Sequence, residues 1–405
     1  MAVLPFIHLF MKNNSYSLSY IRVLYAMWLV RTVLSYLLTY RKSLLIADQK
    51  EYIASITGLI LNVVSYLAII LLVTWEQNYL LALGIGTVTE VVLNIWISWY
   101  VEQKYPFLRQ RRKEKSTSSL TKRIVRDLKS LFISRISEKM LYCTDNLIIS
   151  GFIGVGTVGR YANYCMITQA ISNILTILAN TIQPTVGDYF TEKNRQRNYE
   201  ILRQLTFGFF CIASVVSVGL FSLITPFVRD IWLGPSYELG WGITVFCIVV
   251  LLVRIMGLPL SLVMGVTGLF EKEKNVGASS ALLNLIVSLA LVKPYGMAGV
   301  LLGTLLSYLL QILYRYIIYF RDFLEMPGEA LRYAQDIGEY LAVIAGEVLL
   351  MQKIVPLIYG AGGMLLFCVC FLLCIAIPLL LDLVIFGRGW RLQSIVTMVK
   401  GMRKA

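Results

Sequence analysis

The sequence predicts an all-α polytopic membrane protein, from its composition, the length of its apolar runs and the placement of its charges. Hydrophobic residues make up 58% of the 405 residues and charged residues only 15%, whereas soluble domains have about 45–50% and about 25%. Apolar runs of about 20 residues, the length of a membrane-spanning helix, recur along the chain. Because lipid cannot hydrogen-bond the backbone, these runs should be helices. A transmembrane β-barrel would show short alternating segments instead.

We expect eleven spans in chain order, with residues 1–11 as the tail of a further one. The spans are 19–40, 54–75, 78–101, 129–153, 160–190, 205–228, 241–269, 276–293, 297–319, 337–355 and 363–386. Lysine and arginine gather in alternate loops, 26 on one side of the membrane against six on the other. Since this excess marks the cytoplasmic side, we expect a multi-pass protein of the cytoplasmic membrane with its C-terminus inside.

Composition also disfavours several other classes of function. The net charge of +14 lies mostly in loops between spans, which fits membrane topology better than a nucleic-acid surface. All seven cysteines lie within apolar spans, and no two pairs make a zinc-binding spacing. His8 is the only histidine, so histidine-based catalysis has one poor candidate. We therefore expect no nucleic-acid partner, no metal centre and no resident cofactor.

Two pairs of segments repeat at nearly one offset, which indicates an internal duplication. LILNVVSYLAI (59–69) aligns with ALLNLIVSLAL (281–291) at an offset of 222, and PFIHLFMKNNSY (5–16) aligns with PFVRDIWLGPSY (226–237) at 221. The repeat keeps its orientation in the membrane. It therefore predicts two six-helix lobes in a parallel pseudo-two-fold repeat, with the axis along the membrane normal. The first lobe would start about 95 residues before Met1, so we expect it to be incomplete; a natural eleven-span protein is the alternative.

These patterns predict five parts of the chain. They are an incomplete N-terminal lobe (1–101), a basic cytoplasmic linker with an interfacial helix (102–128), a complete C-terminal lobe (129–319), two extra transmembrane helices (320–386) and a cytoplasmic tail (387–405). The interfacial helix is expected because Ile124, Leu128 and Leu131 share one face beside basic residues.

The segment EKMLYCTDNLIIS (138–150) carries charges inside a predicted span. Arg135, Glu138 and Asp145 recur at helical spacing and share one face, and Lys139 lies beside them. A charge facing lipid costs at least about 2.5–3.5 kcal/mol, so this face should meet protein or a water-filled cavity. Two interpretations remain: an internal ion-pair network that holds helices together, or a polar lumen for a polar or ionic substrate.

Other charges inside spans support a lumen. Arg31 and Arg254 lie mid-span, and the repeat places them within one residue of equivalence. Two guanidinium groups at matching depth suit an anionic substrate, since guanidinium pairs with phosphate in a bidentate way. Glu90 shares a helical face with Thr87 and Asn94.

The predicted span 160–190 is too polar for a helix surrounded by lipid. Arg160 opens it at the expected outer mouth, and Asn163 and Gln169 lie further along. These amides would either meet a polar substrate or only hold helices together.

Three segments, YRKSLLIADQKEYI (40–53), TDNLIISGFIGVGTVGRYANY (144–164) and PFVRDIWLGPSY (226–237), resemble the Wzx-type oligosaccharide flippases of polysaccharide biosynthesis. These proteins belong to the multidrug/oligosaccharidyl-lipid/polysaccharide exporter superfamily. The resemblance covers essentially the whole chain, which looks like a 14-span member without the first two spans and most of the third. It implies two lobes around a central cavity that work by alternating access. The implied activity turns undecaprenyl-diphosphate-linked oligosaccharide from the inner to the outer leaflet, for cell-surface polysaccharide biosynthesis.

The resemblance gives the polar residues expected roles. The diphosphate would lie near Arg31 and Arg254, and the sugar would meet the polar side chains of span 160–190. Arg135 and Lys139 would guide entry from the cytoplasmic side. Candidates for coupling to a proton or sodium ion are Glu138, Asp145 and Glu90, because a buried carboxylate can change its protonation between states. Expected partners are the bilayer, the lipid-linked oligosaccharide and, as candidates, glycosyltransferases or a polymerase of the same pathway.

Three alternatives remain. A drug or cation antiporter of the same superfamily should have an acidic, aromatic cavity, which mid-span arginines disfavour. A membrane glycosyltransferase or polymerase would need a large outer loop or a nucleotide-sugar domain, and the predicted outer loops are short, so we expect no enzyme. The third alternative is a fragment of a flippase with no activity.

Overall fold

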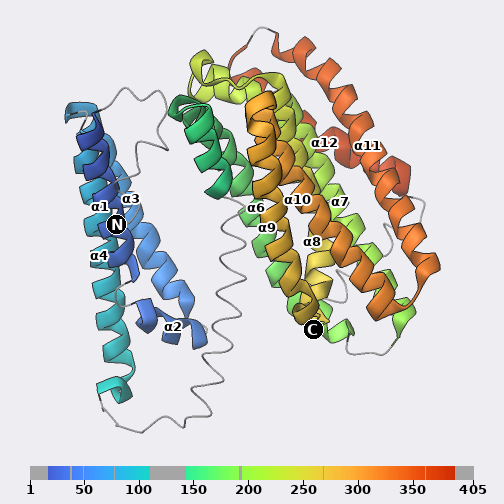
Figure 1. The fold of residues 1–405 in the computed structure, drawn as a ribbon, viewed down its shortest axis with the longest axis horizontal. Helices are drawn as coiled ribbons and strands as arrows, with labels where there is room; N and C mark the ends of the chain where they lie inside the picture. The colour runs from blue at the N-terminus through green and yellow to red at the C-terminus, as the bar shows by residue number, and fades with distance from the viewer. Residues whose placement is uncertain are drawn as a thin grey trace. The chain divides into compact units, whose positions relative to one another are not determined.

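The computed structural model describes residues 17–36, 39–48, 50–76, 78–109, 143–190, 194–267, 269–360 and 362–387. Throughout these ranges the regular elements are helices and no strand occurs (Figure 1). Nine of the helices described there are long and apolar enough to cross a membrane. The prediction of an all-α polytopic membrane protein is therefore confirmed.

The described residues fall into two compact units, and the first holds the N-terminal helices. These are α1 (Leu18–Tyr36), α2 (Thr39–Ala47), α3 (Glu51–Glu76) and α4 (Tyr79–Lys104), followed by one 3-10 turn, η2 (Pro106–Arg109). The Asn78 side chain accepts a hydrogen bond from the Leu80 amide at 3.0 Å and caps the start of α4. The helix α4 is the centre of this unit, because α1, α2 and α3 all pack against it.

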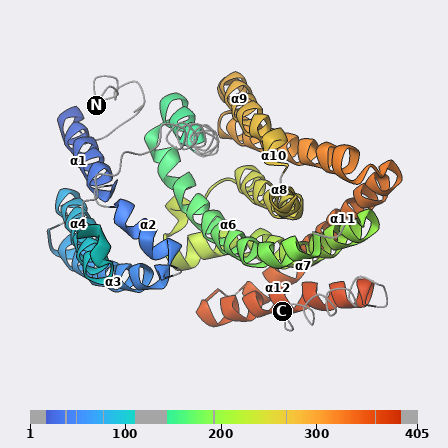
Figure 2. The same cartoon turned by 90° about the horizontal axis from the view of Figure 1, so that it is seen from below.

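The second unit begins with a helical segment at 143–152. It continues with α6 (Val155–Phe190), α7 (Arg195–Pro226) with the π-helix η3 (Phe227–Trp232), the 3-10 turn η4 (Pro235–Tyr237), α8 (Trp241–Val266), α9 (Phe270–Tyr295), α10 (Met297–Ile317) with the π-helix η5 (Ile318–Leu324), α11 (Pro327–Tyr359) and α12 (Met364–Phe386). The helix α8 lies in the interior of this unit and packs against α6, α7 and α10 (Figure 2).

The helices α9 and α10 form the closest helix pair of this unit. Gly296 turns the chain between them with φ of 57°, a conformation that favours glycine. On α10, a methyl group at Gly299 would collide with the Leu291 carbonyl, and one at Gly303 would collide with the Ser288 hydroxyl. The spacing Gly-x-x-x-Gly predicts such a backbone approach, and the structure confirms it.

The helices α11 and α12 cover the outer side of α7 (Figure 2). Asp336 of α11 accepts hydrogen bonds from the Nε and Nη2 atoms of Arg203 at 2.6 and 2.9 Å. A cluster of stacked and edge-on rings, Phe207, Phe210, Tyr340 and Phe386, fills the space between the three helices.

Both units contain the same contact pattern at the repeat offset. In the first unit α4 packs against α1 and α3; in the second, α10 packs against α8 and α9. The offset of 222 places α8 on α1, α9 on α3 and α10 on α4. The packing inside each unit therefore agrees with a duplication of this three-helix group.

Some predicted boundaries were wrong. The expected span 19–40 divides into α1 and α2, and α1 is not among the nine membrane-long helices. The helix α6 starts at Val155 because Gly154, with φ of 139°, ends the preceding helix. The helix α11 starts ten residues before the predicted 337, since its first turns pack on α7 through Tyr333 and Asp336. The segment 110–142, with most of the expected linker and its interfacial helix, lies outside the described residues, as do 1–16 and 388–405.

Candidate functional site

A polar cavity of about 340 Å³ lies inside the C-terminal unit, between segment 143–152, α6, α8 and α10. Its polar lining consists of Asp145, Asn146, Tyr161, Thr168, Gln169, Arg254, Thr304 and Tyr308. Among spans this apolar, such a concentration of polar groups marks the cavity as the candidate site.

Asp145 is the acid among the described residues that line the cavity, and it is only 4% exposed. Its Oδ2 atom accepts a hydrogen bond from the Thr304 hydroxyl at 2.6 Å, and its Oδ1 atom accepts one from the Asn284 amide at 3.4 Å. The same amide donates to Thr304 Oγ1 at 2.9 Å. Three helical segments thus place one carboxylate, one amide and one hydroxyl together, a set of oxygen atoms suited to a small cation or a proton.

Arg254 brings a positive charge to the same cavity. Its guanidinium Cζ lies 5.5 Å from the centroid of the Tyr308 ring on α10, within the range of a cation–π contact. The ring supports the arginine from one side without neutralising its charge. A cavity that holds both Asp145 and Arg254 can therefore bind an anionic group and a cation close together.

The structure brings only part of the predicted polar set of span 160–190 to this cavity. Gln169 lines it and donates to Asn173 Oδ1 at 3.1 Å. Asn163 instead donates to the Gly159 carbonyl of its own helix at 3.1 Å, and Arg160 is exposed. Neither Asn163 nor Arg160 lines the cavity. The face of α6 that lines it contains Tyr161, Cys165 and Thr168, and positions 160 and 163 lie on another face of the helix.

The remaining predicted residues lie elsewhere. Arg31 forms an ion pair with Glu90 at 3.7 Å in the N-terminal unit, where both side chains are about one-third exposed. Gly86 makes room for it, since a methyl group there would lie 2.9 Å from Arg31 Nη1. The repeat offset of 222 aligns Gly86 with Tyr308. Arg31 therefore has a glycine beside it and pairs with Glu90, whereas its counterpart Arg254 contacts the Tyr308 ring. Arg135, Glu138 and Lys139 lie outside the described residues.

Three residues around Asp145 and Arg254 have no counterpart among the sequence predictions: Asn284, Thr304 and Tyr308. Asn284 was visible as a repeated asparagine in an apolar span, which is itself a sign of a buried polar contact. Thr304 and Tyr308 have no such signal, because both are common in membrane helices. Only the packing of α10 against segment 143–152 and α8 shows what they contact.

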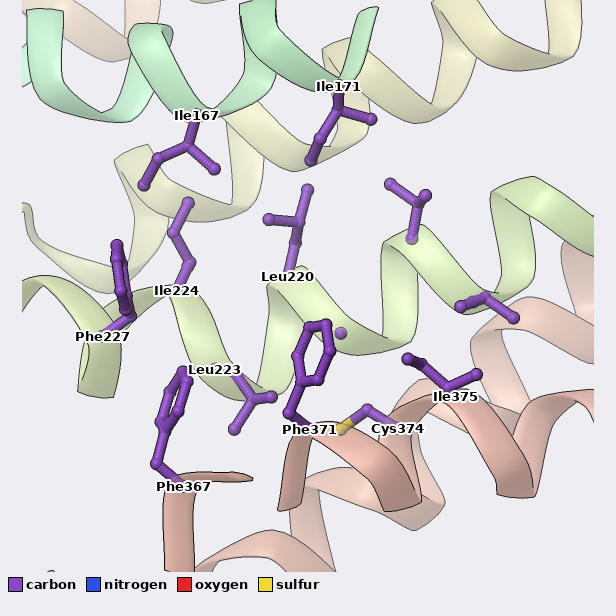
Figure 3. A pocket seen from close by; sticks show the side chains of 13 residues that line it. Ile167, Ile171, Leu220, Leu223, Ile224, Phe227, Phe367, Phe371, Cys374 and Ile375 are labelled. Atoms are coloured by element: carbon purple, nitrogen blue, oxygen red, sulfur yellow. The ribbon is translucent and has the colours of Figure 1, made fainter. Parts of the chain in front are cut away.

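A second pocket, of about 350 Å³, lies on the other side of α6 and is apolar (Figure 3). Ile167 and Ile171 of α6 line it together with Leu220 and Leu223 of α7 and Phe371 of α12. The helix α6 therefore turns Gln169 to the polar cavity and these two isoleucines to the apolar pocket. One helix separates a polar from an apolar compartment.

Within the ranges that the structure describes, no group of three or more histidine, cysteine, aspartate or glutamate residues could hold a metal ion. The oxygen atoms around Asp145 come from one carboxylate and two neutral side chains. They suit a weakly held monovalent ion or a proton better than a firmly bound divalent metal.

Comparisons with known proteins agree with this architecture. Residues 1–190 match a family model described as polysaccharide biosynthesis protein. The fold is similar to a solved structure titled "Lipid II flippase MurJ, inward closed conformation", with a TM-score of 0.65 and 15% identity over 95% of this chain and 80% of that chain. No curated protein matches the sequence.

Proposed function

We propose that this chain, a membrane protein of the polysaccharide-biosynthesis and flippase type by its family and fold matches, moves a lipid-linked oligosaccharide across the cytoplasmic membrane. The direction is from the inner to the outer leaflet, by alternating access, and the lipid is undecaprenyl diphosphate. The observation that carries this proposal is the polar cavity with Arg254 and Asp145 beside an apolar pocket. Such a substrate has an anionic, a sugar and a hydrocarbon part, and each needs a different surface.

Arg254 is the proposed contact for the diphosphate. A guanidinium group is always charged and can donate two parallel hydrogen bonds to phosphate oxygens. The Tyr308 ring holds this group in place without offering a competing anion. Arg31, the counterpart of Arg254 under the repeat, remains a candidate phosphate contact of the N-terminal unit, where its ion pair with Glu90 would have to open.

Asp145 is the proposed coupling residue. Its partners Asn284 and Thr304 are neutral, so binding of a proton or sodium ion would neutralise the only acid among the described residues that line the cavity. Arg254 would then be the remaining charged group among the described lining residues, which favours an anionic substrate. Glu138 and Glu90 remain candidates for the same role, and Arg135 and Lys139 remain candidates for guiding entry.

The other parts of the substrate have proposed surfaces as well. Gln169 and Asn146 line the cavity and can hydrogen-bond sugar hydroxyls, whereas Asn163 and Arg160 would meet sugar only beyond it. The apolar pocket on the far side of α6 would hold a section of the isoprenoid chain, because burial of hydrocarbon there needs no polar partner. In this function the C-terminus lies on the cytoplasmic side, and the partners are glycosyltransferases or a polymerase of the pathway.

The experiment uses cells whose only copy of the protein is the wild type or Arg254→Gln. Surface polysaccharide and membrane-retained lipid-linked oligosaccharide are both quantified. Since a charge-assisted hydrogen bond contributes about 1.5–3 kcal/mol, we expect surface polysaccharide to fall about 10- to 160-fold, with accumulation of the lipid-linked precursor.

The matched control is Arg332→Gln, which removes an exposed arginine of α11 outside the cavity and should leave both quantities unchanged. Undiminished surface polysaccharide in Arg254→Gln would reject the phosphate role. A change in drug resistance without any change in polysaccharide would favour the antiporter alternative.

A further inference from the structure

Two carboxylates lie buried between α7, α11 and α12, and none of the functions proposed above uses them. Glu347 of α11 is 3% exposed and Asp382 of α12 is 4% exposed. Both lie in the stripes of buried residues by which α11 and α12 pack into the unit. Neither lines the polar cavity that contains Asp145.

The hydrogen bonds of this acidic pair are incomplete. Glu347 Oε2 accepts from the Ser214 hydroxyl of α7 at 2.6 Å. Within the described part of the chain, Glu347 Oε1 and both oxygens of Asp382 are buried without a hydrogen-bond partner. The two carboxylates also interact electrostatically with each other. A buried oxygen without a partner carries a desolvation cost of about 1–3 kcal/mol or more, so three of them in one place indicate a missing ligand.

A second acid of α11 shows how this interface pairs a buried carboxylate. Asp336 lies eleven residues before Glu347, and its partner Arg203 lies eleven residues before Ser214. The two contacts therefore lie in the same helix pair, about 16 Å apart. At the first position α7 supplies an arginine; at the second it supplies only a hydroxyl group.

Among the described residues of α7, α11 and α12, no side chain with a permanent positive charge faces the pair. On α7, residues 204–226 contain no charged residue, and Cys211 is the titratable group that interacts with both acids. On α11, Glu339 and Lys353 are exposed, away from the buried stripe. On α12, Asp382 is the only charged residue between 364 and 386.

Aromatic rings close one end of this site against water. Phe386 follows Asp382 by one helical turn, and its ring meets Phe207, Phe210 and Tyr340 at centroid distances of 5.5 to 5.8 Å. Two like charges held together in such a dry environment cannot both stay ionised. Neutralisation must come from a bound cation, and the smallest is a proton.

We propose that Glu347 and Asp382, assisted by Ser214, form a proton-binding site between α7, α11 and α12. One carboxyl group keeps its proton and the other remains a carboxylate, so the pair carries a single negative charge. The Ser214 hydroxyl donates to that charge. Loss of the proton leaves two like charges between α12 and its neighbours, and their repulsion loosens the packing of α12. This inference does not depend on the substrate proposed above.

The test is infrared difference spectroscopy on the purified full chain, with the pH raised stepwise and the sample exchanged into deuterated water. We expect the C=O stretching band of a protonated carboxyl group at neutral pH, with a small isotope shift that reports a buried group. Glu347→Gln and Asp382→Asn should each change this band. Asp336→Asn is the matched control and should leave it intact, since that carboxylate already has Arg203.

Two further measurements guard against misfolded variants. Size-exclusion profiles identify variants that do not fold, and the wild-type spectrum shows without any variant whether a protonated carboxyl group is present at all. Absence of a protonated-carboxyl band in the wild type at neutral pH would overturn the proposal. A response to added sodium chloride, compared with choline chloride at constant pH, that is lost in Glu347→Gln and in Asp382→Asn would show that a metal cation occupies the site and would also overturn it. Transport is not measured, so failure here leaves the proposed function untouched.

Discussion

Thr304 donates a hydrogen bond of 2.6 Å to Asp145, although 159 residues separate the two in the chain. This bond fixes one oxygen of the cavity carboxylate, and the Asn284 amide contacts the other. The carboxylate is therefore held from two sides in a single orientation, while its neighbour Arg254 rests on the Tyr308 ring.

Replacement of Thr304 by valine should destabilise the protein. The substitution keeps the shape of the side chain but leaves Asp145 Oδ2 buried without its donor, at a cost of about 1–3 kcal/mol. Thermal unfolding in detergent measures the change. Thr267→Val is the control, because that hydroxyl bonds only to carbonyls of its own helix. Equal melting temperatures for the two variants would contradict the importance of the Asp145 contact.

Asp145→Asn should abolish the ion dependence of transport. The amide keeps the volume and can still accept from Thr304, but it can no longer change its charge. In membrane vesicles with an imposed proton or sodium gradient, wild-type transport should follow one of the two gradients, and the variant should follow neither. Glu339→Gln, on the exposed face of α11, serves as the control. A variant that still responds to the gradient would move the coupling role to Glu138 or Glu90.

Transport should depend on the aromatic face of Tyr308, which contacts Arg254, and not on its hydroxyl group. Tyr308→Phe keeps the contact with Arg254 and should retain most of the activity. Tyr308→Leu loses a cation–π contact worth about 0.5–2 kcal/mol, so the concentration of substrate for half-maximal transport should rise about 2- to 30-fold. If the phenylalanine and leucine variants behave alike, the ring has no positioning role.

The apolar pocket can be filled from α7. Gly219 lines the pocket, and a methyl group there would meet open space, so Gly219→Phe should place a ring in the proposed path of the isoprenoid chain. We expect at least tenfold slower transport, with unchanged stability. Gly208→Phe is the matched control, because Gly208 also faces open space on α7 but is not a lining residue. Normal transport by the Gly219 variant would remove the pocket from the proposed function.

Gly299→Ala should weaken the packing of α9 against α10. The added methyl group would collide with the Leu291 carbonyl, which is backbone and cannot rotate away, so the expected loss is about 1–3 kcal/mol. Gly346→Ala, on α11 where nothing lies within 4 Å, should instead be neutral or stabilising by up to about 1 kcal/mol. The changes in the free energy of unfolding, measured from the unfolding curves of the two variants, should therefore have opposite signs or differ clearly in size.

The sequence by itself determined the class of the fold and the repeat. The fold class follows from the length of the apolar runs, and the repeat follows from a constant offset. Local packing alters neither of these regularities. It also determined that Asp145, Arg254 and Arg31 had to avoid lipid, because the cost of exposing a charge to hydrocarbon does not depend on which neighbours are present.

Only the tertiary structure decided which partners those charges have. Arg31 meets Glu90, Arg254 meets a tyrosine ring, and Asp145 meets Thr304 and Asn284, although the repeat makes the two arginines equivalent. Glu347 and Asp382 are single acids in two separate apolar spans, and nothing in their spacing relates one to the other. They become a pair because α11 and α12 both pack on α7, and such contacts between distant segments come from side-chain packing and not from periodicity.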